Sequence, residues 1–180
     1  MNINFSQFPQ LSTERLLLRS LKQTDVGEIF ALRSDDVINQ YLDRPKANTV
    51  EDAHLFIQQI INIVANNKCI YWAITLKPET TLAGTICLWN INNETSEAEV
   101  GYELLRNYQG KGIMQEAIKR VLNFGFEQIR FETIVACVHK ENLSSIKLLQ
   151  KSNFMLSEDG KAIDNMHAYK LSAAMFRASC

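Results

Sequence analysis

The sequence lacks several features that would assign it to whole classes of protein. It has no run of basic residues, and 19 Lys and Arg face 20 Asp and Glu, so direct contact with nucleic acid is not expected. No segment approaches the ~20 consecutive apolar residues of a membrane-spanning helix, and the N-terminus has no apolar signal core. No membrane partner is expected either.

Cysteine and histidine are few and scattered. The four cysteines are Cys69, Cys87, Cys137 and Cys180. They show no pair spacing, which together with the absent signal core indicates a reduced, cytoplasmic protein. The three histidines are His54, His139 and His167. None stands at metal-ligand spacing from Cys, Asp or Glu, so no metal site is predicted.

The length and composition are those of one globular domain. The chain has 180 residues, 46% of them hydrophobic and 22% charged, enough for a sizeable core. Repeats, low-complexity segments and linkers are absent, so residues 1–180 are expected to form a single domain, with residues 1–14 as an irregular arm.

A strand, a glycine-bearing turn and a helix follow one another in the middle of the chain. Residues 97–104 alternate apolar and polar side chains as a strand does, and apolar residues recur at helical spacing from Ile113 to Ile129. Between them, Gly110-Lys111-Gly112 brings backbone amides and a cation to the start of the helix. This arrangement is typical of an anion site. It is equally the form of a plain tight turn, and it matches neither a Rossmann fingerprint nor a P-loop.

The remaining pattern predicts a mixed, mostly antiparallel sheet of about six or seven strands flanked by helices. Strands are expected at 15–21, 70–75, 81–91, 97–104, 132–138, 155–158 and 167–171, with a turn around Asp159-Gly160. Helices are expected from Val26, near 37–42, at 50–66 behind a capping box, at 113–129 and from Asn142. The 97–104 and 132–138 strands should run parallel, because a helix connects them.

A second informative stretch runs from His139 to Phe154. Asn142 stands where a helix N-cap belongs, and Ser145 and Leu149 should lie on the same side of the helix. Taken alone, these residues are also consistent with an ordinary cap and a solvated serine. Asn153 precedes Phe154 at a point where Asn can adopt a positive φ.

The segment AEVGYELLRNYQGKGIMQEA resembles the acyl-CoA-binding segment of the GCN5-related N-acetyltransferases (GNAT). Within that superfamily, it and the TERLLLR phrase are most similar to the RimJ/RimL-like branch, which acetylates the N-termini of ribosomal proteins. The Asn142–Phe154 stretch resembles the family's Asn-x-x-Ala/Ser…Gly-Phe segment. Three positions depart from the family pattern: Asn107 in place of Gln or Arg, Leu149 in place of a general-acid tyrosine, and Asn153 in place of glycine.

The resemblance implies a GNAT-type α/β domain in which a splayed parallel strand pair forms the acyl-CoA cleft. It also implies acetyl-CoA as co-substrate, without a metal. The cofactor-binding residues that it implies are Leu104, Leu105, Gln109, Gly110, Lys111, Gly112, Ile113, Met114, Asn142 and Lys147.

Two residues are predicted to take part in the chemistry. Glu99, in the AEVGY phrase, is the first choice for the base that takes the amine proton, and Ser145 is the donor to the departing thiolate. Glu103 has the same facing and could be the base instead, as could a water molecule. Glu99 could also be an exposed or salt-bridged strand residue.

The expected reaction is transfer of an acetyl group from acetyl-CoA to a primary amine, with the N-terminus of a ribosomal protein as the first-choice acceptor. Two alternatives stay open: acetylation of a small amine (an antibiotic, a polyamine or an amino-acid derivative), and a non-catalytic acyl-CoA sensor. The protein is expected to be a monomer or a homodimer.

Overall fold

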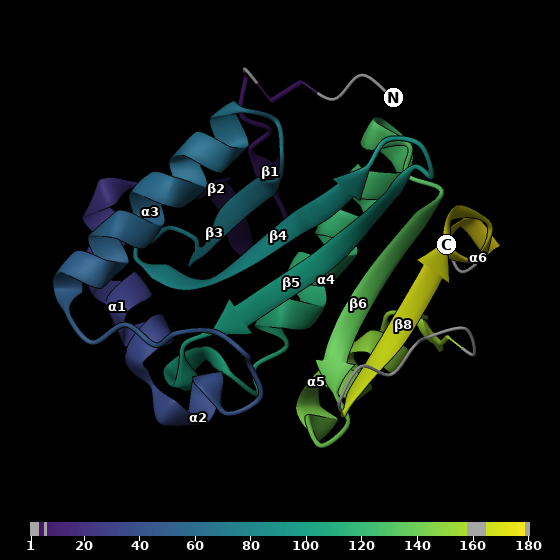
Figure 1. Ribbon diagram of the computed structural model, residues 1–180. Coiled ribbons are helices and arrows are strands. Elements are labelled where there is room, and N and C mark those ends of the chain that lie inside the picture. The colour runs from purple at the N-terminus through teal and green to yellow at the C-terminus, as the bar shows by residue number, and fades with distance from the viewer. Residues whose placement is uncertain (1–3, 6, 158–164, 179–180) are drawn as a thin grey trace.

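One sheet runs through the whole molecule (Figure 1). The structure is a computed structural model and describes residues 4–5, 7–157 and 165–178. Within these residues, eight strands form the sheet in the order β1-β2-β3-β4-β5-β6-β8-β7. The strands are β1 (Leu11–Ser12), β2 (Leu16–Ser20), β3 (Ile70–Leu76), β4 (Leu82–Asn92), β5 (Glu97–Leu104), β6 (Thr133–His139), β7 (Met155–Leu156) and β8 (Met166–Ser172).

The strand directions match the predicted mixed sheet. All neighbouring strands pair antiparallel except β5 and β6, which pair parallel. The sheet has one strand more than the predicted six or seven, because β1 has only two residues, too few to show a period. β7 lies within the strand predicted at 155–158. The prediction that residues 1–14 are irregular is wrong for Leu11 and Ser12, which pair with Leu18 and Leu17 of β2. The turn expected around Asp159-Gly160 lies outside the described residues.

The helices follow the apolar periodicity with small differences. They are α1 (Val26–Ser34), α2 (Asp36–Asn39), α3 (Val50–Ala65), α4 (Ile113–Asn123), α5 (Leu143–Lys151) and α6 (Ala173–Ala178). The helix predicted over 113–129 changes at Phe124 into a π-helical turn, Phe124–Ile129. The predicted capping box of α3 is present, with the Thr49 side chain accepting from the Asp52 N–H at 3.2 Å. α6 was not predicted.

The helices cover the two faces of the sheet separately. In Figure 1, α1 and α3 lie on the near face and α4 lies behind the sheet. The larger core packs against α4 and includes Trp72, Phe126 and Phe131. The smaller core lies under α1 and α3 and includes Ile29 and Ile57. β3, for example, presents Trp72 to the larger core and Tyr71 and Ala73 to the smaller one.

A buried ion pair fixes α1 to the sheet. The Arg19 guanidinium of β2 donates two hydrogen bonds to the Asp25 carboxylate, at 2.8 and 2.7 Å, and both side chains are less than a tenth exposed. The Asp25 side chain does not cap α1. Asp25 occupies the N-cap position, but its carboxylate accepts from Arg19 and from the Lys22 N–H instead.

Candidate active site

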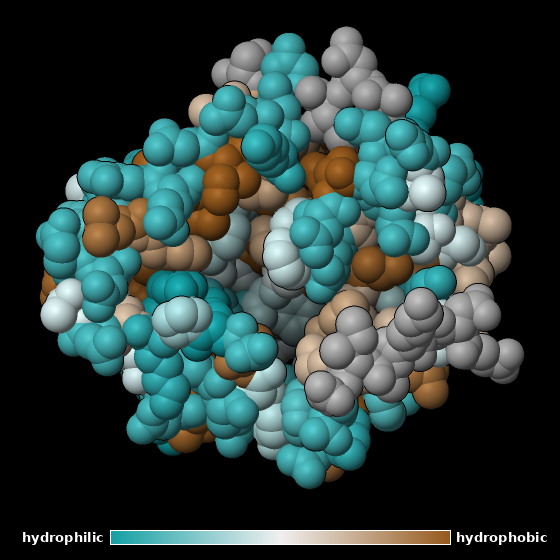
Figure 2. All heavy atoms as spheres, in the orientation of Figure 1, coloured by the Kyte–Doolittle hydropathy of each residue, from teal (hydrophilic) through white to brown (hydrophobic). Residues whose placement is uncertain are grey.

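A cleft opens where the parallel strands β5 and β6 separate. They share three residue pairs, from Glu97 with Thr133 to Glu99 with Val135. Beyond these, β5 continues along β4 to Leu104 while β6 continues along β8 to His139. In the space-filling view of Figure 2, the surface is hollowed near its middle, between the α1–α3 side and the β6–β8 side. The strand pair is therefore splayed, as expected of an acyl-CoA cleft.

The glycine turn lies at the end of β5. A short 3₁₀ turn, Arg106–Tyr108, follows Leu105, and Gln109 folds back to donate from Nε2 to the Leu104 carbonyl at 2.9 Å. Gly110 and Gly112 both have a φ of 73°, a backbone conformation that costs other residues free energy. Nothing lies within 4 Å of the position that a Cβ of Gly110 would take.

The helix α4 starts at this turn without a side-chain cap. Its N-cap residue is Gly112, and the Glu116 N–H is bonded to the Gly112 carbonyl at 3.1 Å. The N–H groups before Glu116 therefore point out of the helix start, where the helix dipole is positive. Ile113 and Met114 anchor the first turn by burying their side chains, while Lys111 is exposed. This geometry can hold an anion.

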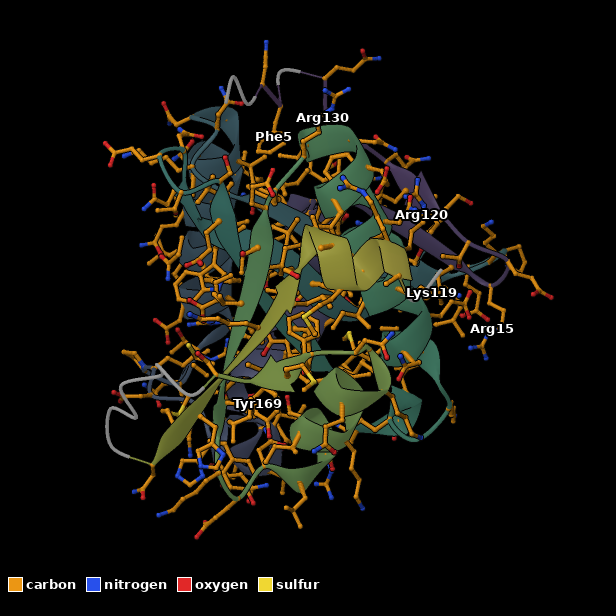
Figure 3. The ribbon with its side chains drawn as sticks, turned by 90° about the vertical axis from the view of Figure 1, so that its right-hand side faces the viewer. Phe5, Arg15, Lys119, Arg120, Arg130 and Tyr169 are labelled. Atoms are coloured by element: carbon orange, nitrogen blue, oxygen red, sulfur yellow. The ribbon has the colours of Figure 1, made fainter. Side chains whose placement is uncertain are left out.

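A second cation, Arg15, reaches the same turn. Its guanidinium donates to the Lys111 carbonyl at 3.3 Å and pairs with Glu116 at 2.7 Å. Its Nη2 atom lies 3.6 Å from the position that a Cβ of Gly112 would take. Figure 3 shows Arg15 on the same side of the molecule as Lys119 and Arg120. The sequence offered no signal for Arg15 at this site, because it lies 96 residues from Lys111.

Glu99 lies at the narrow end of the cleft. Its carboxylate accepts a hydrogen bond from Asn90 Nδ2 at 2.9 Å. Burial raises the pKa of Glu99, and hydrogen bonds from Asn90 and from the thiol and backbone N–H of Cys137 partly oppose that rise. Asn90 stands at a bulge in β4 with a φ of 47°. The carboxylate thus reaches from β5 to β6 at the point where their pairing ends.

Glu103, the alternative base, has the same facing as Glu99 but is committed to another partner. Arg44, from the segment between α2 and α3, pairs with its carboxylate at 2.6 Å. The same guanidinium donates to Asn39 Oδ1 at 2.7 Å, and Thr85 donates to Glu103 at 3.3 Å. Only 8% of the Glu103 side chain is exposed. Glu103 therefore fastens the α2–α3 segment to the sheet.

The opposite wall of the cleft is the start of α5. Asn142 caps this helix as predicted, since its side chain accepts from the Ser145 N–H at 3.1 Å. The Ser145 hydroxyl is not a free surface group: its oxygen lies 2.6 Å from the Tyr102 hydroxyl of β5. Leu149, one turn further on, is fully buried, and Lys147 is exposed. Asn153 has the predicted positive φ, 63°.

The wide end of the cleft is bridged by two rings. Tyr41, from the segment after α2, stacks on His139 at the end of β6, with ring centroids 5.2 Å apart and planes at 23°. The contact joins the N-terminal helical layer to β6. Among the described residues, no group of three or more His, Cys, Asp or Glu could hold a metal ion.

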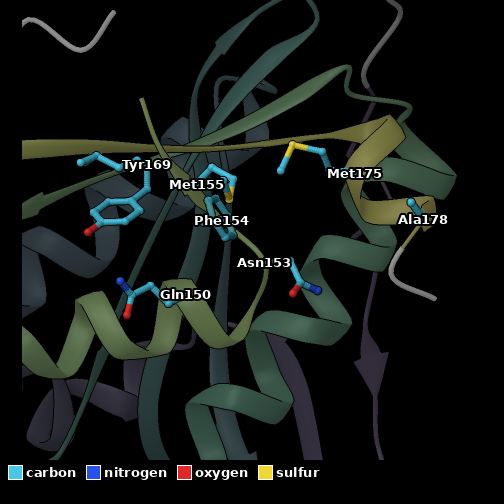
Figure 4. A pocket seen from close by; sticks show the side chains of 8 residues that line it. Gln150, Asn153, Phe154, Met155, Tyr169, Met175 and Ala178 are labelled. Carbon is cyan, nitrogen blue, oxygen red and sulfur yellow. The ribbon is translucent and has the colours of Figure 1, made fainter. Parts of the chain in front are cut away.

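A separate pocket lies outside the cleft, among α5, β7, β8 and α6 (Figure 4). Its lining residues are Gln150, Asn153, Phe154, Met155, Leu156, Tyr169, Met175 and Ala178. None of them carries a charge, so this pocket offers neither a carboxylate base nor a cation for a phosphate.

The predicted site residues thus fall into three groups around one cleft. The turn and the first residues of α4 form one end, Glu99 forms the other, and Asn142 and Ser145 form a wall, joined to β5 by Tyr102. Sequence reasoning missed Arg15 and Tyr102 as members of the site. Tyr102 stood within the AEVGY phrase, yet its partner lies 43 residues away. Such a pairing has no local pattern.

Comparison with known proteins assigns this architecture to a family. Residues 15–155 match the model of the acetyltransferase (GNAT) domain. The chain is 31% identical over 147 residues to the uncharacterized N-acetyltransferase YoaA of Bacillus subtilis (strain 168). This match covers 82% of this chain and 83% of YoaA. It is 33% identical over 144 residues to the uncharacterized N-acetyltransferase p20 of Bacillus licheniformis, covering 80% of this chain and 81% of p20.

The fold is also that of solved acetyltransferases. The structure of RimL, a ribosomal L7/L12 alpha-N-protein acetyltransferase in complex with coenzyme A, superimposes with a TM-score of 0.80 at 17% identity. The match covers 93% of this chain and 99% of that one. In the part of this chain that the structure describes, no helix is long and apolar enough to cross a membrane. The chain belongs to the acetyltransferase (GNAT) family and is an acetyl-CoA-dependent N-acetyltransferase.

Proposed function

We propose that the protein transfers the acetyl group of acetyl-CoA directly to the N-terminal α-amine of a protein, of ribosomal-protein type. The observation that carries this proposal is the placement of Glu99 and Ser145 around the splay of β5 and β6. Glu99 reaches across at the narrow end, and Ser145 lies on the α5 wall, in contact with the other face of β5. Attack and departure at one acyl carbon need groups on different sides.

Acetyl-CoA is proposed to lie along β5 with its pyrophosphate on the amides of Gln109–Met114. The uncapped start of α4, the open space over Gly110 and the nearby Arg15 support this placement. Leu104 and Leu105 would contact the pantetheine from β5. Asn142 and Lys147 would contact the cofactor from α5, where Lys147 is exposed.

The chemistry assigns each wall a task. Glu99 takes a proton from the incoming ammonium, directly or through water, so that the neutral amine can attack the thioester carbonyl. A backbone N–H of β5 polarises that carbonyl. The C–N bond forms, the C–S bond breaks, and the electron pair of the C–S bond moves to the sulfur, to which the Ser145 hydroxyl donates a hydrogen bond. The nitrogen loses its remaining extra proton through water to the thiolate, so that the products are the neutral amide and the thiol of coenzyme A. The protein therefore contributes orientation and desolvation to an already activated acyl group.

An α-amine suits this base better than a lysine-type amine does. The pKa of an α-amino group is about 7.7–8.0, whereas that of a lysine-type amine is about 10.4. A carboxylate can take the proton of the first far more readily near neutral pH. RimL, which shares the fold, acts on an α-N-protein amine according to its name, and the AEVGY phrase resembles its branch.

An acceptor panel tests the proposal. The enzyme is mixed with acetyl-CoA and either short peptides with free N-termini, the same peptides with blocked N-termini, or small amines that include spermidine, and thiol release is followed. We expect turnover with free peptides and none with blocked ones. Preferential turnover of a small amine would replace the acceptor class. Coenzyme A binding without turnover on any amine would favour the acyl-CoA sensor.

A further inference from the structure

The hydroxyls of Tyr102 and Ser145 form a short hydrogen bond between β5 and α5. Their oxygens are 2.6 Å apart, and the two residues are 43 positions apart in the chain. Ser145 is held in place separately, because its backbone N–H donates to Asn142. In the described part of the chain, neither hydroxyl has another hydrogen-bonding partner in the protein.

The direction of this hydrogen bond follows from the acidity of the two groups. Each hydroxyl has one hydrogen and can also accept, but a phenol is far more acidic than an alcohol and is the better donor. When Tyr102 donates, the Ser145 oxygen is satisfied as an acceptor and its own hydrogen is free to point elsewhere. The α5 wall supplies no phenol of its own one turn on, because Leu149 is apolar and fully buried.

We propose that Tyr102 is a positioning residue for the acetyl transfer: its hydroxyl donates to Ser145 and so directs the Ser145 hydrogen to the sulfur of coenzyme A. The inference rests on the proposed placement of the cofactor in the cleft. As the C–S bond breaks and the electron pair moves to the sulfur, the Ser145 hydroxyl donates to the developing thiolate. The hydrogen bond from Tyr102 polarises that hydroxyl and strengthens its donation.

Tyr102 does not itself supply a proton. Burial raises its pKa to about 12, and the hydrogen bond with Ser145 only partly opposes that rise. The phenol therefore stays protonated, and remains a donor, throughout the range in which the enzyme works. Loss of Tyr102 should lower kcat without moving the pH profile.

A spectroscopic titration of bound coenzyme A tests this without any acceptor. The thiolate absorbs in the ultraviolet, so the pKa of the bound thiol can be followed in the parent, Tyr102→Phe, Ser145→Ala and the double variant. Complexes with desulfo-coenzyme A serve as blanks for tyrosine ionisation. Tyr102→Phe keeps the packed ring, and Ser144→Ala, an exposed neighbour, is the matched control.

We expect Tyr102→Phe and Ser145→Ala each to weaken ionisation of the bound thiol by about 3- to 10-fold, the size of one hydrogen bond. The double variant should fall no further than Ser145→Ala, and Ser144→Ala should match the parent. With an active acceptor, kcat should follow the same pattern while the KM for acetyl-CoA stays constant.

Three results would overturn the inference. The pKa of the bound thiol could be the same in Tyr102→Phe as in the parent, or the same in Ser145→Ala as in the parent. The effects of the two substitutions on that pKa could also add up in the double variant. If coenzyme A binds, the result for Tyr102→Phe or additive effects in the double variant would leave the proposed function standing. A parent-like Ser145→Ala would in addition remove Ser145 from the proposed chemistry, while the acceptor panel would still decide the acetyl transfer. Absence of coenzyme A binding in the parent would overturn both.

Discussion

Glu99, the proposed base, also connects two strands. Its carboxylate accepts from Asn90 of β4 and from Cys137 of β6, across the point where β5 and β6 stop pairing. These hydrogen bonds hold the carboxylate in one orientation without neutralising it, because none of the donors is charged. A carboxylate that is held in one orientation beside an open cleft is suited to accept a proton.

Replacing Glu99 with Gln should therefore lower kcat by ~10²-fold or more while the affinity for acetyl-CoA is nearly unchanged. The pH profile gives a second measurement. The base must be ionised, and burial raises its pKa. The rate of the parent should therefore fall on acidification at a higher pH than the usual carboxyl range of about 4.

Two neighbouring carboxylates serve as controls for Glu99. Glu97→Gln removes a charge from the same face of β5 and should keep most of the rate. Glu103→Gln should mainly lower the melting temperature, because it leaves Arg44 with a neutral partner in a buried position. A loss of rate in Glu103→Gln but not in Glu99→Gln would transfer the role of base to Glu103.

Among single residues, the sequence predicted those whose contacts are local and missed those whose partners lie far away in the chain. The Asn142 cap and the positive φ of Asn153 follow from short-range chemistry, and the structure confirms both. The pairing of Arg44 with Glu103 joins residues 59 positions apart, and no periodic pattern encodes it. The roles of Glu99 and Ser145 stay predictions.

The form of the glycine turn depends on two residues without a side chain, which adopt a positive φ at little cost. With φ at 73°, Gly110 and Gly112 let the chain reverse from β5 into α4 and leave the helix start bare. Any side chain at 112 would be placed beside Arg15, in the space where the phosphates are proposed to bind.

Gly112→Asp, compared with Gly112→Asn, isolates the charge at this turn. The two side chains have nearly the same size, and Asn and Asp both tolerate positive φ better than most residues. We expect Gly112→Asp to weaken coenzyme A binding by ~10-fold or more relative to Gly112→Asn in calorimetry, because a carboxylate repels the pyrophosphate. Equal affinities in the two variants would show that the phosphates bind elsewhere.

Long elements were predicted closely, and some short ones were missed. β5 was predicted with its observed bounds, and α3 was predicted over 50–66 and ends at Ala65. β1 has only two residues, and the π-helical turn after α4 keeps an apolar spacing that is hard to distinguish from that of an α-helix. Such elements depend on neighbours that the sequence does not place.

The whole molecule depends on contacts that fix the helical layers to the sheet. One of these contacts is the Arg19–Asp25 ion pair, in which both side chains are buried. Asp25→Asn would leave a buried guanidinium without its counter-charge, and we expect a loss of about 3 kcal/mol in the free energy of unfolding. Chemical denaturation monitored by circular dichroism measures it.

Asp36→Asn is the matched control, because Asp36 pairs with Lys46 at the surface, with 86% of its side chain exposed. Its loss should leave the free energy of unfolding nearly unchanged, because water screens an exposed ion pair. If Asp25→Asn and Asp36→Asn were equally stable, the pair at Asp25 would not anchor α1.

The short stretch over which β5 and β6 pair also affects the internal motions of the molecule. Among the described residues, three paired positions of β5 and β6 join the β1–β5 part of the sheet to the β6–β8 part. Local opening needs least free energy where backbone hydrogen bonds are fewest. Within β5 and β6, isotope exchange of amide hydrogens should therefore be faster near the ends that separate than along the paired residues. A ligand that binds both strands would slow exchange in the middle of the sheet rather than at its rim.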